Sequence, residues 1–318
     1  VYDRALIQDE EGNPWPMNDG KYPTGRAMTV KEGMTRSLNT ISAQLLKQLT
    51  PQKSYEFMTQ QLGFKLVDSR TNEDGTVQSD IDLAPLALGA LTDGVTVREM
   101  AGGFSTFIND GVYGGTRTYT KVTDSEGNTI MENTPNTDKG FTNVRTDYYM
   151  LDCLQNVTAH GTAYGIQLDG VETGGKTGTT TSNTDIWFCG ITPKYSGAVW
   201  VGYEHNYRLD GLYGRNAAEI WLAVMQKVHA GDSGLVFDSH PQDFEEVTYC
   251  MDTGLLASGA CRAAGRAATG RFWKDKVPTE TCSHQNIENK YDFGSMGVDN
   301  YYYDDEEDDS DSDSSSSD

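Results

Sequence analysis

The chain has 318 residues, with 47 acidic against 25 basic side chains and a formal net charge of −22. A hydrophobic content of 36% is enough for a packed core and excludes wholesale disorder. The sequence contains no run of about 18 apolar residues, so it predicts no membrane-spanning helix. Because nucleic-acid binding requires a basic surface, a chain this acidic is not expected to bind nucleic acid.

The two ends of the sequence are polar. Residues 1–28 are rich in turn residues and predict an extended connection. The sequence opens without Met or a signal segment, so we expect either a processed N-terminus or a fragment of a longer product. Residues 293–318 predict a disordered acidic, Ser-rich tail, which carries nine carboxylates and no base from Asp304 onward. A solubilising role is the expected one for this tail.

The first half of the chain predicts helices. Thr29 and Glu32 form a capping-box pattern, and helical spacing of apolar residues follows as far as Leu45. This pattern predicts one helix that contains Ser37-Leu38-Asn39. A second helix is predicted from Thr50-Pro51 to Gly63, and residues 66–80 are expected to be a loop.

A second group of helical signals follows. Thr96 and Glu99 form another capping box, which opens a helix that ends near Asn109. Residues 124–128 predict a hairpin turn. Thr146 is expected to cap a long helix, whose apolar face includes Leu154.

The pattern then changes to strands. Residues 171–180, 186–192 and 198–203 are β-rich, and the last two runs are joined by a hairpin turn at 193–197. A helix is predicted over 217–228, with Ile220, Val224 and Val228 on one face. This order predicts an α+β fold with an antiparallel sheet flanked by helices. We expect one domain over residues 1–235, a small Cys-containing extension over 236–292, and the tail.

The five cysteines carry no metal-binding spacing. No CxxC pair occurs and the five histidines are scattered, so a zinc ribbon or another metal site is not expected. Cys250, Cys261 and Cys282 lie within 33 residues in a Gly-rich stretch, which is typical of a disulfide in an oxidising compartment. Cys153 and Cys189 lie in apolar segments and are expected to be buried thiols.

The most informative stretch is Thr173-Gly174-Gly175-Lys176-Thr177-Gly178-Thr179-Thr180. Paired glycines let a ligand approach a strand closely, and a lysine with neighbouring hydroxyls can hold a carboxylate. Gly170, Gly175, Lys176 and Thr177 also satisfy the phosphate-loop string. A phosphate loop must open a long helix, however, whereas this stretch leads into a predicted strand. A nucleotide-binding protein is therefore the weakest of the alternatives.

Ser37 and Asn39, considered alone, could be ordinary solvent-facing residues. Combined with Lys176-Thr177-Gly178, they match the S-x-N and K-T-G motifs of the penicillin-recognising serine acyltransferases. Further matching segments are 28–40, 85–90, 93–95, 161–163, 176–188 and 190–193. The chain resembles most closely the transpeptidase domain of class A penicillin-binding proteins. The Cys250–His284 region resembles the C-terminal extension of Gram-positive members.

The resemblance implies roles for individual residues in cross-linking of peptidoglycan, without a cofactor. Ser37 would relay a proton to the departing amine, Asn39 would hydrogen-bond the substrate amide, and Lys176 would add positive potential. Substrate binding would fall to Thr177, Gly178, Thr179 and Thr180, through the terminal carboxylate of D-Ala-D-Ala stem peptides and an oxyanion hole at the Thr179 N–H. β-Lactams and the cell-wall synthesis machinery are the implied partners. The implied location is the outer face of the bacterial cytoplasmic membrane, with the anchor and a glycosyltransferase domain upstream.

One motif of this family is missing. No serine in the sequence has a lysine three residues later, so the S-x-x-K segment with the nucleophile is absent. We expect that segment just upstream of Val1 and expect this chain alone to be inactive. The alternative is a non-catalytic module that binds stem peptides of the cell wall.

Overall fold

A computed structural model describes residues 1–8, 12–19, 21–134, 140, 142–238 and 241–284. The predicted tail at 293–318 lies outside these residues. The fold is α+β, as predicted, and its centre is a three-stranded antiparallel sheet in the order β7-β8-β9. The strands are β7 (Gly174–Thr179), β8 (Asp185–Ile191) and β9 (Ser196–Gly202), close to the predicted bounds. The turn at 193–197 joins the last two strands.

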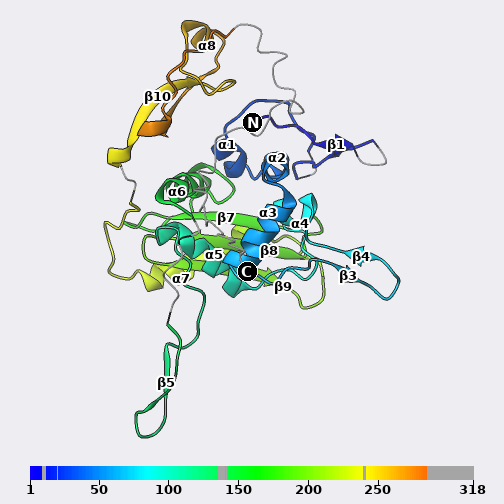
Figure 1. Ribbon diagram of the computed structural model, residues 1–318, viewed down its shortest axis with the longest axis vertical. Helices are drawn as coiled ribbons and strands as arrows, with labels where there is room; N and C mark the ends of the chain where they lie inside the picture. Colours follow the sequence, from blue (N-terminus) through cyan, green and yellow to red (C-terminus); the bar gives the residue numbers. More distant parts are fainter. Residues whose placement is uncertain (9–11, 20, 135–139, 141, 239–240, 285–318) are drawn as a thin grey trace, which may run out of the picture.

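Helices cover both faces of this sheet (Figure 1). The β8 side chains Ile186 and Phe188 join one core cluster with Trp221 of α7 (Gly214–Val228). Ile191 joins the other cluster with Leu154 of α6 (Val144–His160). Alternate residues of β8 are thus buried on opposite faces, which is why the strand is apolar after Asp185. The helix α5 (Val97–Ser105) packs near β9, and Ser196 donates to the Ala101 carbonyl at 2.7 Å.

The prediction of one continuous first helix is wrong, because the structure has two helices there. The structure has α1 (Val30–Thr35) and α2 (Asn39–Leu49), separated at Ser37 by a left-handed backbone with φ 55°. Because Ser37 leaves the helical region and Leu38 is extended, Ser37-Leu38-Asn39 lies at a helix junction. Periodicity alone hid the break, since Met34 and Ile41, on either side of it, keep helical spacing.

The remaining helical predictions are mostly confirmed. Thr50 caps α3 (Pro51–Glu56), which continues as the π-helix η1 (Phe57–Gln61). Thr96 and Glu99 form the predicted capping box of α5, which runs on into η2 (Thr106–Ile108). The cap of α6 is Asn143 rather than Thr146, because the Asn143 side chain accepts the Thr146 N–H. The helix α4 (Leu83–Leu88) was not predicted, since its short apolar run has no helical period of its own.

Short strands fill segments expected to be irregular. Residues 1–28 contain β1 (Ile7–Gln8) paired with β2 (Pro14–Trp15), and the expected loop at 66–80 contains β3 (Arg70–Thr71) paired with β4 (Val77–Gln78). The predicted turn at 124–128 joins β5 (Lys121–Thr123) and β6 (Thr129–Glu132). This hairpin projects far from the body (Figure 1).

The helix α7 begins three residues before its predicted start. Ile220, Val224 and Val228 do share a face, but that face is exposed to solvent, with relative accessibilities of 48%, 52% and 46%. The buried face instead carries Ala217, Ala218, Trp221 and Met225.

The C-terminal part is a hairpin of β10 (Phe244–Cys250) and β11 (Ala267–Trp273) with α8 (Gly259–Ala263) between them, flanked by η3 (Pro241–Asp243) and η4 (Lys274–Lys276). It stands away from the sheet, on the α6 side (Figure 1). The rings of Phe244 and Tyr148 pack with centroids 3.9 Å apart, and Arg145 pairs with Asp275 at 3.0 Å. The boundary at 235/236 stays a prediction. Across the residues described, every helix is too short or too polar to cross a membrane.

Candidate active site

Lys176 lies in the middle of β7, opposite Cys189 of β8. Its ammonium nitrogen donates to the Ser37 hydroxyl at 2.8 Å and to the Thr177 carbonyl at 2.7 Å. The structure therefore brings together the two residues that the S-x-N and K-T-G motifs contribute, from positions 139 apart in the sequence. This contact would allow a proton to pass between the amine and the hydroxyl.

The helix break directs Ser37 towards the strand. The Ser37 N–H donates to the Met34 carbonyl and the Leu38 N–H to the Gly33 carbonyl, which closes a tight turn after α1. The end of α1 is also held against the end of α6, where Asn156 donates to the Thr35 hydroxyl at 2.6 Å. This turn, which an uninterrupted helix would lack, precedes the contact of Ser37 with Lys176.

Burial changes the acidity of Lys176. The side chain is half-buried, and loss of solvent lowers the pKa of the ammonium group to about 8. A lysine with this pKa is still mainly charged at neutral pH, yet a measurable fraction is neutral. The same group can therefore supply positive potential to a bound anion and take up a proton.

The threonines of β7 face two neighbouring segments. The Thr177 and Thr162 hydroxyls lie 2.6 Å apart, and the Thr179 hydroxyl accepts the Gly214 N–H at 3.2 Å. Gly214 is the first residue of α7, and a Cβ there would lie 2.9 Å from the Thr177 Cβ and 3.0 Å from the Gly178 carbonyl oxygen. Only glycine lets the helix start this close to the strand.

Thr180 has different surroundings from the other predicted substrate-binding residues. Its hydroxyl oxygen accepts the N–H groups of Thr184 and Asp185 at 3.0 and 3.1 Å, so it stabilises the turn between β7 and β8. Asn183 in that turn has φ 53° and donates to the Leu212 carbonyl at 3.0 Å. In this structure Thr180 therefore stabilises the backbone next to the site.

Asn39 is the first residue of α2. Its side-chain amide donates to the Met17 carbonyl at 2.8 Å, which ties the N-terminal segment to the beginning of the helix. The structure thus places Asn39 two residues from Ser37 and gives its amide nitrogen a backbone partner.

Sequence reasoning assigned no role to three residues around the site. Thr162 contacts Thr177, Gly214 contacts Thr179, and Arg215 donates to the Tyr164 carbonyl at 2.7 Å. The Gly161-Thr162-Ala163 segment belongs to the resemblance and was a usable signal for Thr162. Gly214 and Arg215 carried no motif.

The phosphate-loop alternative does not fit this geometry. Lys176 and Thr177 lie within a β-strand, and the chain continues through a turn into β8 rather than into a helix. The backbone nest that holds a nucleotide phosphate needs a strand–loop–helix arrangement.

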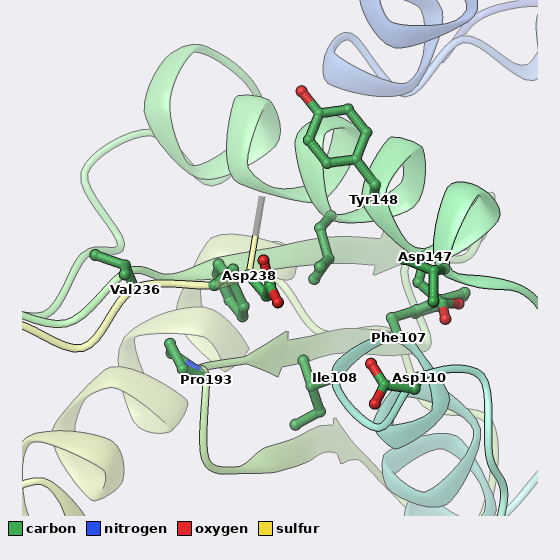
Figure 2. Close-up of a pocket in the computed structure, with 11 residues that line it drawn as sticks. Phe107, Ile108, Asp110, Asp147, Tyr148, Pro193, Val236 and Asp238 are labelled. Carbon is green, nitrogen blue, oxygen red and sulfur yellow. The ribbon is translucent and has the colours of Figure 1, made fainter. Parts of the chain in front are cut away.

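A pocket of about 270 Å³ lies elsewhere, between η2, α6 and the segment at 236–238 (Figure 2). Burial raises the pKa of Asp147, and the nearby charge of Asp110 raises it further. The hydrogen bond from the Thr142 hydroxyl acts in the opposite direction but is weaker than the effect of burial. None of the predicted site residues lines this pocket.

All five cysteines are free thiols, so the disulfide expected among Cys250, Cys261 and Cys282 is absent from the structure. Cys189 is buried, as predicted, whereas Cys153 is only half-buried. The sequence prediction of no metal site rested on spacing along the chain. The fold instead brings three of the cysteines and a histidine together.

Comparisons with known proteins identify the family of the chain. The family model described as the penicillin-binding protein transpeptidase domain matches residues 2–226, and that of the penicillin-binding protein 1A C-terminal domain matches residues 240–286. Penicillin-binding protein 1A of Clostridium botulinum is 31% identical over 234 residues, which cover 69% of this chain and 27% of that protein. Penicillin-binding protein 4 of Bacillus subtilis is 30% identical over 217 residues, or 68% of this chain and 32% of that protein.

Solved structures agree on the fold. Penicillin-binding protein 1A of Haemophilus influenzae superposes with a TM-score of 0.66 at 21% identity, over 89% of this chain and 45% of that one. PonA1 of Mycobacterium tuberculosis superposes with a TM-score of 0.61 at 25% identity, over 74% of this chain and 64% of that one. The chain spans about a quarter to a third of the length of the curated relatives named above. The chain belongs to the penicillin-binding protein transpeptidase domain family, and its C-terminal part matches the penicillin-binding protein 1A C-terminal domain.

Proposed function

We propose that this chain provides the substrate-binding and proton-relay part of a serine-type D,D-transpeptidase that cross-links peptidoglycan. The observation that carries the proposal is the 2.8 Å contact between Lys176 Nζ and Ser37 Oγ, beside the strand that bears Thr177 and Thr179. A desolvated amine, a bridging hydroxyl and adjacent hydroxyl donors suit acyl transfer at a peptide that ends in a carboxylate.

Each group would act at a defined point of the reaction. The Thr177 and Thr179 hydroxyls would donate to the terminal carboxylate of a D-Ala-D-Ala stem peptide. Attack of a serine on the carbonyl of the penultimate D-Ala would break the C–N bond, and the proton lost by that serine would reach the leaving D-Ala amine by way of Lys176 and Ser37. The Thr179 N–H would stabilise the oxyanion formed in that step. An acceptor amine would then displace the ester and return its proton along the same path.

The acylated serine is the component that this sequence does not supply as an S-x-x-K motif. We propose that it comes from a segment of the gene product outside these 318 residues. We further propose that the gene product is the bifunctional glycosyltransferase and transpeptidase of the cell-wall machinery. Its substrates would place it on the outer face of the bacterial membrane. Three further residues complete the proposed site. Asn39 would hydrogen-bond the substrate amide, and Gly178 would let the substrate approach β7 closely. Thr180 stabilises the β7–β8 turn beside them.

β-Lactams are the proposed covalent ligands of the gene product, because they resemble the acyl donor. A similar protein, PonA1 of Mycobacterium tuberculosis, has a structure in complex with penicillin V. The alternative, a stem-peptide-binding module that forms no acyl-enzyme, is favoured by one observation, the missing S-x-x-K motif.

The test is intact-mass spectrometry of the native gene product after incubation with penicillin. We expect one β-lactam adduct per chain, slower formation of that adduct in Lys176→Ala, and an unchanged rate in Lys121→Ala, which removes an exposed lysine in β5. Absence of an adduct, together with saturable binding of a D-Ala-D-Ala peptide, would instead establish the non-catalytic module.

A further inference from the structure

Four potential metal ligands converge in the C-terminal hairpin, at the end remote from the central sheet (Figure 1). They are Cys250 at the end of β10, Cys261 in α8, and Cys282 and His284 in the segment that follows η4. The three Sγ atoms and the imidazole nitrogen all lie within 4.8 Å of one another. Residues separated by as many as 34 positions thus form one cluster.

The dimensions of the cluster suit a tetrahedral zinc ion. With Zn–S bonds of about 2.3 Å and Zn–N bonds of about 2.0 Å, neighbouring ligand atoms of a tetrahedron lie roughly 3.5–3.8 Å apart. The Cys250 Sγ and His284 Nδ1 atoms lie 3.7 Å apart. Three thiolates and one imidazole are a ligand set of structural zinc sites, and a tetrahedral set of sulfur and nitrogen favours zinc over magnesium or calcium.

Backbone hydrogen bonds fix the positions of the ligands. The Cys250 N–H donates to Leu255 O at 2.7 Å and the Cys282 N–H to Leu256 O at 2.8 Å, so one turn holds both residues. The Cys261 carbonyl accepts the Arg266 N–H at 2.8 Å, which ties α8 to the start of β11. The cluster is therefore organised by the local fold and does not depend on side-chain rotation alone.

The sulfur atoms also have polar neighbours of the kind that surround metal thiolates. The His284 N–H donates to Cys282 Sγ at 3.3 Å, and the Ser258 hydroxyl lies 3.3 Å from Cys261 Sγ. Such outer contacts orient the ligands of metal centres and stabilise the charge on sulfur.

The three cysteines are the main buried core of this part of the chain. Among the described residues 242–284, the buried side chains are Phe244, which packs on Tyr148 of α6, and the three cysteines, at 0%, 0% and 3% exposure. A unit of about 45 residues rarely folds around so little apolar surface without a metal or a disulfide. A disulfide would use two of the cysteines and leave the third thiol and His284 unexplained, whereas one metal ion uses all four.

We infer that Cys250, Cys261, Cys282 and His284 bind one Zn²⁺ ion per chain, as a structural site that holds the C-terminal hairpin together. Binding displaces the three thiol protons and leaves a complex of three thiolates, a neutral imidazole and Zn²⁺. Four protein ligands close the coordination sphere, so the ion has no open position for catalysis. The inference is independent of the proposed transpeptidase function.

The test is metal binding by the complete 318-residue chain. The chain is stripped with chelator under reducing conditions, its five thiols are counted with a thiol reagent, and it is titrated with Zn²⁺ and, separately, Co²⁺. We expect one equivalent of either ion. The cobalt form should show the intense visible bands of tetrahedral Co²⁺ and a thiolate charge-transfer band. Zinc should raise the unfolding temperature of the wild-type chain.

Variants identify the ligands. Cys261→Ser should abolish the tetrahedral cobalt spectrum. Cys153→Ser removes a half-buried thiol of α6 and should leave stoichiometric binding intact. His284→Cys should keep one equivalent of metal with a shifted charge-transfer band, which separates loss of a ligand from loss of the fold. The inference is overturned if the reduced wild-type chain with five free thiols binds no cobalt. It is also overturned if intact mass and peptide mapping of the native product show a disulfide within the cluster.

Discussion

The hydroxyl oxygens of Thr162 and Thr177 lie 2.6 Å apart, which joins the segment after α6 to the strand that carries Lys176. This hydrogen bond holds the Thr177 side chain in one orientation at the proposed carboxylate site. Both hydroxyls can exchange this mutual hydrogen bond for one to an anion, because each is both donor and acceptor.

Thr177→Val should weaken the reaction with β-lactams while leaving the fold intact. The valine side chain has nearly the same shape but no hydroxyl, and a hydrogen bond to a charged group contributes about 1.5–3 kcal/mol. We expect the second-order rate of acylation of the native gene product to fall by roughly tenfold to a hundredfold. Thr129→Val, in the exposed strand β6, is the matched control and should not change that rate. An unaltered rate in Thr177→Val would remove Thr177 from the proposed site.

The Ser37 hydroxyl and backbone should have separable effects. Ser37→Ala and Ser37→Gly both remove the proton relay, so the acylation rate should fall by about 10²–10⁴-fold in each. The two differ in stability, because φ is 55° at this position and glycine adopts such a conformation without the cost borne by alanine. We expect Ser37→Gly to be more stable to denaturant than Ser37→Ala by about 1 kcal/mol. Equal stabilities would argue against the left-handed junction.

Lys176 should react with amine reagents at a lower pH than other lysines. Burial lowers its pKa to about 8, so its neutral form should become half-populated near pH 8. Competitive trace labelling followed by peptide mass spectrometry would give this midpoint. Lys194 is the internal comparison, since hydrogen bonding to Asp232 raises its pKa. Because the folded-state pKa of Lys176 is below the unfolded one, its contribution to stability should rise with pH from about 8 to about 10.4.

Asp3 should stabilise the chain in a pH-dependent way. Burial alone would raise its pKa, but hydrogen bonds from Thr24, Thr40 and Asn18 outweigh burial and lower the pKa. A depressed carboxylate pKa stabilises the fold above the unfolded value, and this stability is lost as pH falls through the lower folded value. Asp3→Asn should therefore cost about 1–3 kcal/mol at pH 7, and less below pH ~4.

Urea unfolding at two pH values would measure the effect of Asp3→Asn. Asp210→Asn, at an exposed loop carboxylate, is the control and should change stability little at either pH. A penalty for Asp3→Asn that is equal at pH 7 and at pH 3 would contradict the assignment.

Local signals predicted the central sheet and most helices, because capping, alternation and turn residues act over a few positions. The helix break at Ser37 escaped detection because the apolar spacing continues across it. The cap of α6 was misplaced because Asn143 and Thr146 are both competent capping residues, and only the observed contact distinguishes them. The exposed face of α7 was not foreseen, since periodicity identifies a face and says nothing of what covers it.

The candidate site was predicted through motifs rather than through chemistry visible in one segment. Lys176 and Ser37 acquired significance only as a pair, and their contact needs the three-dimensional fold. The cysteine cluster was missed for a different reason. The spacing rule for zinc sites looks for pairs of cysteines within one short turn, as in CxxC. Here Cys250, Cys261 and Cys282 come from separate elements, so their proximity could not be read from the sequence.

The separation of 139 residues between Ser37 and Lys176 has a consequence for folding kinetics. Closing so long a loop costs chain entropy before any contact compensates for it, so contacts of this kind form late and slowly. α1, α6 and β7 must already be docked before the hydroxyl and the amine can meet. We therefore expect Lys176 to keep an ordinary, high pKa in early folding intermediates and to acquire its low value only in the last step of refolding.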